Sequence, residues 1–468
     1  MKIKFHLPIL LVLVICPKIV AQEKVYLSDT NLQIAIRSTL QKTPAEIITK
    51  ADMNQLTTLV AKRKNIKQLD GLENSVNIES LNLWQNQITN LSPLSSLTRL
   101  KTLELGRNQI QNISPLAGLV FLKSLGLREN QISDISSLSK MTELKTLELR
   151  INKIKNISPL ARMAKLESLN VAINQINDIL ALSTLTNLKA INLSKNQISN
   201  VTPLAGLVKL EHLDFANNQV SNIEALSSLK NLKYLHVPFN QIKDINSLSG
   251  LINLETAFID RNKIEDISPL SELTNLKVLF LRDNYRIKNI APIAKLSNLE
   301  ELNVYNNKIE DISAVVGLTN LRVLCLGKNS IQNISPISEL INLQVLELRD
   351  NQIRRISSIR NLKNITSLNL RGNNIRNIVP LVELTNLATL DLSYNQIDNI
   401  TVLSKLPNLK WLDLRNNNVK NPAVFRKLKK LEHLDLRGNP LSKESYQNHI
   451  PQMLKNNPNL KLFCDHPL

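Results

Sequence analysis

Leucine and isoleucine recur along this chain at fixed intervals, in a pattern that repeats every 22 residues. Each copy has the form LxxLxLxxNxIxxIxxLxxLxx, as in the stretch "LKTLELGRNQIQNISPLAGL" that begins at residue 100. The LxL alternation predicts a short strand, and the wider spacing after it predicts turns. A single copy could not bury its apolar positions alone, so successive copies must stack and share one continuous core.

One asparagine in each copy, at position 9, follows the predicted strand. Its amide group can both donate and accept hydrogen bonds, so we expect it to satisfy backbone groups of adjacent turns. Successive asparagines are 22 residues apart, except for one step of 23 between Asn284 and Asn307, and the first turn has Lys64 instead. The predicted structural ladder consists of Asn86, Asn108, Asn130, Asn152, Asn174, Asn196, Asn218, Asn240, Asn262, Asn284, Asn307, Asn329, Asn351, Asn373, Asn395, Asn417 and Asn439.

A period of this length with this pattern is typical of a leucine-rich repeat solenoid. We therefore predict an α/β fold, a right-handed horseshoe or superhelix whose parallel β-sheet, with strands about 4.8 Å apart, lines the concave face. The opposite side of several turns carries Ser-Pro, as in Ser114-Pro115. There we expect short 3₁₀ or helical turns on the convex face, with serine as the capping residue and proline where no N–H is needed.

Both ends of the array depart from the repeat, as stacked arrays require. Before it, Leu32, Ile34 and Ile36 are spaced for a helix, and Thr49-x-x-Asp52 has the spacing of a capping box. After it, a closing helix and a tail are expected. The predicted organisation is a signal peptide (1–21), an α-helical N-terminal cap (22–55), leucine-rich repeats in about 18 turns (56–441) and a C-terminal cap and tail (442–468).

The first residues have the layout of a secretory signal peptide. Lys2 and Lys4 precede an apolar run, residues 7 to 15, that is too short to cross a bilayer, which takes about 20 apolar residues. The small Ala21 then precedes polar residues, so we expect cleavage after Ala21 and export to the medium, the periplasm or the cell surface. A competing interpretation makes Cys16 a lipid-modified N-terminus, but the bulky residue before it and the proline after it disfavour that processing.

The chain is basic, with a formal net charge of +19. Loss of Lys2, Lys4 and Lys18 with the signal peptide would lower this charge to about +16. Such a charge suits a well-solvated rod, and it also suits an anionic partner such as a surface polysaccharide or a membrane surface. Export argues against nucleic acid as a partner.

Positions 3, 5 and 7 of each turn alternate with buried leucines and therefore point outward on the concave sheet; we name them columns 3, 5 and 7. Only 16 residues are Phe, Trp or Tyr, yet six of these lie between residues 234 and 305. Large apolar groups held against water usually mark a binding surface, although they could instead be cross-strand pairs that stabilise the sheet. The candidate partner-binding residues are His212, Tyr234, His236, Phe239, Phe258, Asp260, Phe280, Arg282 and Tyr305.

Other outward positions carry weaker signals. Trp84 and Trp411, one near each end, are predicted secondary contacts. Near the C-terminus, acids in column 5 alternate with arginines in column 7, as Asp413 does with Arg415, and we expect lateral ion pairs of small net value. Column 7 runs Trp84, Gly106, Arg128, Arg150, Ala172, Ser194, Ala216, Pro238, Asp260, Arg282, Tyr305, Gly327, Arg349, Arg371, Ser393, Arg415 and Arg437.

The sequence does not point to an enzyme. No Ser-His-Asp set, phosphate-binding loop or pair of carboxylates stands out, so we expect no activity and no cofactor. His212, Asp214 and His236 fall on adjacent strands, but three ligands on a flat sheet lack the convergence of a tetrahedral site, so no metal is expected. Cys325 and Cys464 lie about five or more strand spacings apart, too far for a disulfide.

The helical cap "DTNLQIAIRSTL" and repeats such as "LKTLELGRNQIQNISPLAGL" together resemble the internalin-type leucine-rich repeat proteins of bacteria. The resemblance covers nearly all of the chain after the signal peptide. It implies an exported, non-enzymatic, internalin-like protein whose concave face binds a protein partner, and we expect a monomer. The repeat is also similar to intracellular phosphatase-regulating scaffolds, which the signal peptide disfavours; a binder of anionic surface polysaccharide is the other alternative.

Overall fold

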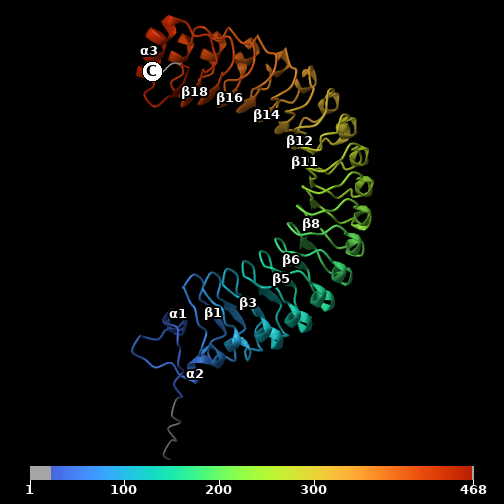
Figure 1. The fold of residues 1–468 in the computed structure, drawn as a ribbon, viewed down its shortest axis with the longest axis vertical. Helices are drawn as coiled ribbons and strands as arrows, with labels where there is room; N and C mark the ends of the chain where they lie inside the picture. Colours follow the sequence, from blue (N-terminus) through green and yellow to red (C-terminus); the bar gives the residue numbers. More distant parts are fainter. Residues whose placement is uncertain (1–22, 466–468) are drawn as a thin grey trace, which may run out of the picture.

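The computed structural model describes residues 23–465 and shows a single arc of stacked turns. Figure 1 shows the strands on the inner side of the arc and the short helical turns on its outer side. The predicted horseshoe, with its parallel sheet on the concave face, is therefore confirmed. The predicted signal peptide and the alternative lipid site at Cys16 lie outside the described residues.

The sheet is parallel throughout the described chain, and each three-residue strand pairs with that of the next turn. Leu213 pairs with Leu235, 22 residues on, whereas Leu279 pairs with Leu302, so the inserted residue lies between these two strands. The strands are β1 Thr58–Val60, β2 Ser80–Asn82, β3 Thr102–Glu104, β4 Ser124–Gly126, β5 Thr146–Glu148, β6 Ser168–Asn170, β7 Ala190–Asn192, β8 His212–Asp214, β9 Tyr234–His236, β10 Thr256–Phe258, β11 Val278–Phe280, β12 Glu301–Asn303, β13 Val323–Cys325, β14 Val345–Glu347, β15 Ser367–Asn369, β16 Thr389–Asp391, β17 Trp411–Asp413, β18 His433–Asp435 and β19 Lys461–Phe463.

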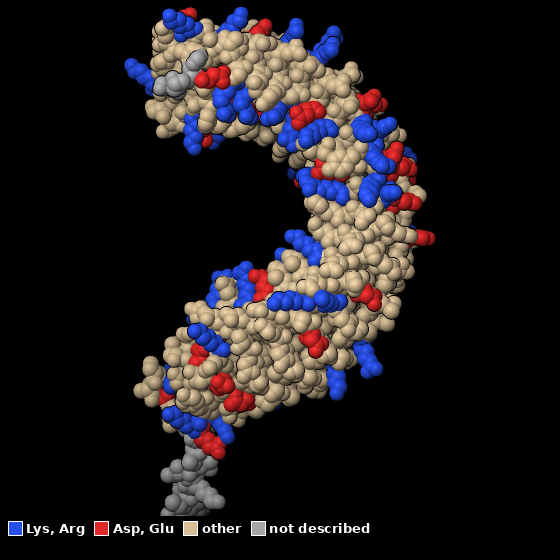
Figure 2. All heavy atoms as spheres, viewed as in Figure 1, with Lys and Arg blue, Asp and Glu red and all other residues tan. Residues whose placement is uncertain are grey.

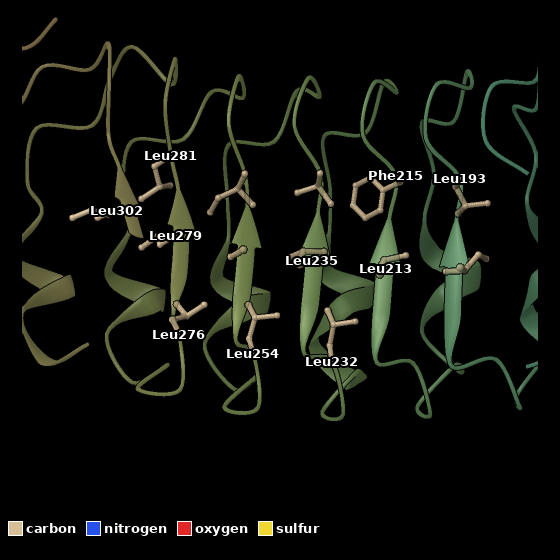
Figure 3. Close-up of a cluster of buried hydrophobic side chains, with 14 of the residues drawn as sticks. Leu193, Leu213, Phe215, Leu232, Leu235, Leu254, Leu276, Leu279, Leu281 and Leu302 are labelled. Carbon is tan, nitrogen blue, oxygen red and sulfur yellow. The ribbon is translucent and has the colours of Figure 1, made fainter. Parts of the chain in front are cut away.

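The core is a set of stacked aliphatic columns inside the turns. Leu213 and Leu235 occupy the same position in adjacent strands and are fully buried, as is Phe215, which replaces the usual leucine at position 6. Figure 3 shows these side chains lying one beside the next along the array. Because each turn covers the apolar positions of its neighbours, the core continues along the arc rather than closing into a sphere.

The outer side of each turn is a short 3₁₀ helix, and proline occupies its first turn where predicted, as at Pro115 in η3. The predicted capping by serine is wrong. The residue before the helix is Ile113, and it is Asn112 whose side chain accepts the Ser114 N–H, at 2.9 Å. An Asn or Asp side chain reaches the backbone two residues later, which leaves the serine without a capping role.

The 3₁₀ helices are η1 Leu72–Asn74, η2 Ser92–Leu94, η3 Ser114–Gly118, η4 Ser136–Lys140, η5 Ser158–Arg162, η6 Leu180–Thr184, η7 Thr202–Leu204, η8 Glu224–Ser228, η9 Asn246–Leu248, η10 Ser268–Leu270, η11 Ala291–Lys295, η12 Ser313–Val315, η13 Ser335–Ile337, η14 Ser357–Ile359, η15 Val379–Glu383, η16 Thr401–Lys405 and η17 Ala423–Lys427. Each of these helices is three or five residues long.

The asparagines at position 9 connect neighbouring turns. Asn130 accepts the Ile110 N–H at 3.0 Å and donates to the carbonyls of Leu105 and Leu127 at 3.1 and 3.0 Å. Asn307 departs from this arrangement, because its buried Oδ1 accepts no hydrogen bond within the described residues. The inserted residue precedes Ile287, whose N–H would otherwise be the donor, so the longer loop moves that donor away.

A second asparagine ladder, which sequence reasoning missed, runs along position 22. Asn231 donates to the Val208 carbonyl at 2.9 Å, and the same bond spans one turn to the next in much of the array. The asparagines that donate in this way are Asn77, Asn187, Asn231, Asn253, Asn275, Asn298, Asn320, Asn342, Asn364, Asn386 and Asn408.

The N-terminal cap comprises α1 Thr30–Leu40 and α2 Lys50–Met53, the latter with the predicted capping box. The predicted helix is present, and its buried side chains include Leu32 and Ile36, whereas Ile34 is 55 % exposed. A helix turns about 100° per residue, which places Ile34 nearly opposite Leu32.

The C-terminal cap comprises a π-helical turn, η18 Ser445–His449, and α3 Ile450–Asn456. The tail then adds β19 beside β18, a strand that the sequence analysis did not predict. Among the helices of residues 23–465, none combines the length and apolar character needed to cross a membrane.

Candidate binding face on the concave sheet

A row of rings crosses strands β8 to β11. The centroids of Tyr234 and Phe258 are 5.9 Å apart, and those of Phe258 and Phe280 are 4.9 Å apart with the rings nearly perpendicular. His212 stacks on Tyr234 at 6.0 Å, and His236 meets Phe258 edge to face at 5.4 Å. We call these five residues the central cluster. The parallel register brings them together, because each lies in column 3 or column 5 of its strand.

The other predicted contact residues lie differently. Phe239, at the edge of the sheet, is 44 % exposed, and the Arg261 guanidinium lies 4.5 Å from its ring centroid. Tyr305 lies outside the row of rings and receives a 2.7 Å hydrogen bond from Arg349 Nη2. Within the central cluster the rings of Tyr234, His236, Phe258 and Phe280 are half-buried, whereas that of His212 is exposed.

In many other turns the column 5 residue stabilises its own turn by a hydrogen bond. In eleven turns an Asn, Asp or Glu at this position accepts the backbone N–H of column 7 in its own turn, as Asn192 does for Ser194 at 2.9 Å. In β9, β10 and β11 the column 5 residues are His236, Phe258 and Phe280. A phenyl ring cannot accept this hydrogen bond, so these turns give up a stabilising contact.

The neighbouring residues compensate for part of that loss. Column 7 beside His236 is Pro238, which has no N–H to satisfy. The Arg282 N–H, two residues after Phe280, is accepted instead by Asp260 Oδ1 of the preceding turn at 2.8 Å. The backbone has therefore adjusted to aromatic residues in column 5, which means that the central cluster is not the simplest way to complete the sheet.

Two aspartates lie beneath this part of the face. Asp260, predicted as an outward contact, is instead only 8 % exposed, because its carboxylate turns toward the next strand to accept the Arg282 N–H. Burial raises the pKa of Asp260 to about 6, against that hydrogen bond. For Asp283 burial acts in the same direction, but hydrogen bonds from Asn306 and Arg282 outweigh it and lower the pKa.

The histidine and aspartate that could have suggested a metal lie close together, with His236 Nδ1 3.1 Å from Asp214 Oδ2. No set of three His, Cys, Asp or Glu side chains in residues 23–465 is arranged to hold a metal ion. Cys325 and Cys464 are not joined by a disulfide. Burial, together with Glu347 and Glu301, raises the pKa of Cys325 to about 11, which makes this thiol a poor nucleophile.

The two tryptophans are engaged within the face. Three guanidinium groups surround Trp84, with Arg63 the nearest at 4.7 Å from a ring centroid. Trp411 stacks on His433, with centroids 5.3 Å apart and an interplanar angle of 13°. Both rings are half-buried rather than free.

The acid and arginine pairs near the C-terminus differ from the predicted surface pairs. The Asp413 and Asp435 side chains are only 2 % and 4 % exposed. Arg415 donates to Asp413 at 2.6 Å and lies 3.4 Å from Asp435, which Arg437 also contacts. These carboxylates are buried and have several donors, so they are not the exposed surface pairs that the sequence predicts.

Known proteins share both the repeat and the shape. Two family models match the chain, "Leucine Rich repeats (2 copies)" at residues 76–118, 121–162, 208–250, 252–295, 274–318, 297–339 and 363–405, and "Leucine rich repeat" at residues 319–375 and 385–441. An internalin (InlF) from Listeria monocytogenes is similar at 32 % identity over 83 % of this chain and 96 % of that chain, with a TM-score of 0.51.

Two further solved structures share the fold. A leucine-rich repeat protein of Leptospira interrogans is 24 % identical over 88 % of this chain and 97 % of its own, with a TM-score of 0.64. The plant peptide hormone receptor RGFR1, solved in complex with RGF2, is 20 % identical over 90 % of this chain and 81 % of its own, with a TM-score of 0.62.

Proposed function

This chain belongs to the leucine-rich repeat family and is of the internalin type, and on that premise we propose that it is an exported, non-enzymatic protein that binds a protein partner through its concave face. Curved repeat arrays present extended concave surfaces of the kind used for binding. The central cluster is the proposed energetic centre of that surface.

The observation that carries the proposal is the change in column 5. Three successive turns replace a hydrogen-bond acceptor with His236, Phe258 and Phe280, and half-buried rings then face the interior of the arc. Aromatic residues are the most frequent hot spots of protein interfaces. Four strands at about 4.8 Å spacing span only about 15 Å, so the cluster would be the centre of a larger footprint of roughly 800 Å² per partner.

Export rests on the sequence of the first residues and on the similarity to an internalin. Mass spectrometry of the native protein separates this from an intracellular phosphatase-regulating scaffold. An exported protein begins at or near Gln22, whereas an intracellular scaffold retains the residues that precede it.

The binding proposal is tested by capture of a partner from cell extracts with residues 22–468, followed by affinity measurements. Replacement of Tyr234, Phe258 and Phe280 by alanine should weaken binding by about 2 kcal/mol or more, which corresponds to roughly thirtyfold. The matched control replaces Tyr26 and Phe121, exposed aromatics outside the concave columns, and should bind normally.

Stability distinguishes the two roles of the rings. Each aromatic pair contributes about 0.5 to 1.5 kcal/mol to the sheet, so a small decrease in melting temperature is expected. If the triple variant binds as well as the unchanged protein but unfolds more easily, the rings are sheet-stabilising pairs and the proposal fails.

If protease treatment of the captured material leaves binding intact, an anionic polysaccharide replaces protein as the partner class.

A further inference from the structure

Column 7 contains the same arrangement twice. Trp84, Gly106, Arg128 and Arg150 follow one another in successive turns, and ten turns later the column runs Tyr305, Gly327, Arg349 and Arg371. The sequence around each glycine repeats as well, with "LGRNQIQNISP" from residue 105 and "LGKNSIQNISP" from residue 326. We call Trp84, Arg107 and Arg128 the N-terminal arm site, and Tyr305, Lys328 and Arg349 the C-terminal arm site.

The two arm sites place cations around a ring in a similar way, although only the N-terminal arm site has a third guanidinium, that of Arg63, 4.7 Å from a ring centroid. In the N-terminal arm site the guanidinium carbons of Arg107 and Arg128 lie 5.5 and 5.7 Å from a ring centroid of Trp84. The ring in each site also belongs to a residue whose N–H is accepted by the asparagine two positions earlier, at 3.1 Å in both cases.

In the C-terminal arm site the ring is that of Tyr305. Lys328 Nζ lies 5.8 Å from the ring centroid, and the guanidinium carbon of Arg349 lies 4.7 Å from it. Each ring is therefore flanked by one cation from the next turn and by one arginine from the turn after that, a favourable cation–π arrangement.

The glycine between them makes this contact possible. A Cβ on Gly106 would lie 3.1 Å from Trp84 Cδ1 and 2.9 Å from Arg128 Cγ. A Cβ on Gly327 would lie 3.0 Å from Tyr305 Cδ2 and 3.1 Å from Arg349 Cγ. Any larger residue would separate ring from arginine, so glycine serves close approach at both places.

Each arm site contains an arginine whose Nε atom makes no hydrogen bond in the described part of the chain, although Arg349 Nε lies 3.7 Å from Glu347 Oε1. The Nε atoms of Arg128 and Arg349 are buried and have no hydrogen-bond partner among the described residues. The next arginines in the column, Arg150 and Arg371, are exposed and half-exposed respectively, and within residues 23–465 neither guanidinium lies within 4.0 Å of a carboxylate oxygen.

From this geometry we infer that the two arm sites are a matched pair that binds acidic segments of the partner protein, one on each arm. The inference rests on the proposed function, because it names the chemistry of the same concave face. A guanidinium held near a ring is restricted in position, and its planar set of N–H groups can bind a carboxylate bidentately. Arg349 already donates to the Tyr305 hydroxyl and lies 3.7 Å from Glu347 Oε1, so an acidic segment of the partner adds to these contacts.

The arms place the two sites so that one partner can use both. Figure 1 shows β3 and β14 on opposite arms of the arc, across its open side. In Figure 2, Lys and Arg side chains lie along the inner edge of both arms with some Asp and Glu among them, and the middle of the arc has fewer charged side chains there. A partner seated on the central cluster therefore meets positive charge at both ends, and engagement of both sites makes the second contact intramolecular.

The test uses poly-L-glutamate as the acidic probe, with tetraglutamate as the short comparison, and residues 22–468 of this chain. The long polymer should bind more tightly than tetraglutamate, and Arg128→Gln with Arg349→Gln should lower its affinity by about tenfold or more, each single change doing less. The matched control, Arg162→Gln with Arg360→Gln, removes the same charge from exposed convex positions and should bind as the unchanged protein does.

Equal losses in the double variant and its control would overturn the inference, because general charge would then explain binding. Tighter binding of dextran sulfate than of poly-L-glutamate, lost in the same double variant, would also overturn it in favour of a polysaccharide. Should the glutamine variants fail to fold, Arg128→Lys with Arg349→Lys keeps the charge without the planar fork, and unchanged affinity there counts against the inference. If the arginine double variant captures the native partner normally while the aromatic variant does not, the inference about the arm sites is wrong. The proposed function of the central cluster then still stands.

Discussion

The C-terminal strands β16 to β18 and the central strands β9 to β11 use column 5 in opposite ways. In the C-terminal strands the position holds Asp391, Asp413 and Asp435, and each accepts the backbone N–H two residues later in its own turn. In the central strands the same position holds a histidine and two phenylalanines. There Asp260 accepts the Arg282 N–H, and Pro238 has no N–H that needs an acceptor.

In the C-terminal strands the column 5 residues accept backbone N–H groups of their own turns, whereas in the central strands they do not. Where the column 5 carboxylate accepts a nearby N–H and pairs with arginine, these polar groups already have partners within the protein. Where the group is aromatic, the surface offers apolar area and no polar partner. This contrast, together with the aromatic residues themselves, supports the proposal that the central turns form the binding region.

The largest expected effect comes from breaking the C-terminal pairs. Asp435→Ala removes the acceptor for the Arg437 N–H and a charge partner of Arg415, and should cost about 3 kcal/mol because the Arg437 backbone N–H and guanidinium lose hydrogen bonds to a carboxylate. Urea unfolding combined with hydrogen exchange in β17 and β18 measures it. Phe280→Ala, at the same column in the centre, should cost less; a larger loss there would remove the contrast between the two regions.

The ladder offers a second comparison, between a regular turn and the inserted one. Asn240 accepts the Val220 N–H and donates to the Phe215 and Val237 carbonyls, so Asn240→Ala should cost about 2 to 3 kcal/mol. Asn307 lacks the accepted bond, and Asn307→Ala should cost about 1 kcal/mol less. Equal melting temperatures for the two variants would contradict this account of the insertion.

The smallest effect is a pH dependence of opposite sign in the two regions. The raised pKa of Asp260, about 6, means that its contribution to stability is present at low pH and is lost as pH rises through about 6. Asp260→Asn keeps an acceptor for the Arg282 N–H without the charge, so above pH 7 the variant should be more stable by about 1 to 2 kcal/mol.

Asp435 provides the matched control for that experiment. Although burial acts to raise it, hydrogen bonds and charge from Arg437 hold the pKa of Asp435 below its ordinary value. Its stabilisation is therefore present at neutral pH and is lost as pH falls through the lowered pKa. Unfolding curves of the unchanged protein and of Asp260→Asn that run parallel from about pH 4 to 8 would contradict the assignment for Asp260.

Much of the binding face was visible in the sequence because columns are a property of the repeat. Once Asn240 fixes the register, the outward positions of Tyr234 and His236 follow from strand alternation. The matched arm sites were also present in column 7, as Trp84-Gly106-Arg128 and Tyr305-Gly327-Arg349. They were missed because contact across an intervening turn depends on the absence of a Cβ, which the pattern of apolar residues does not show.

The sequence by itself determined the solenoid, its parallel sheet and the identity of each column, because a 22-residue period of buried leucines permits stacking in one register only. The tertiary structure alone decided which outward groups remain available. Asp260 is buried because its carboxylate turns to a neighbouring N–H, Ile34 is exposed because the helix turns it away, and Asp413 is buried by its arginine. These outcomes depend on contacts between turns, and spacing along the chain does not specify where a side chain finds its partner.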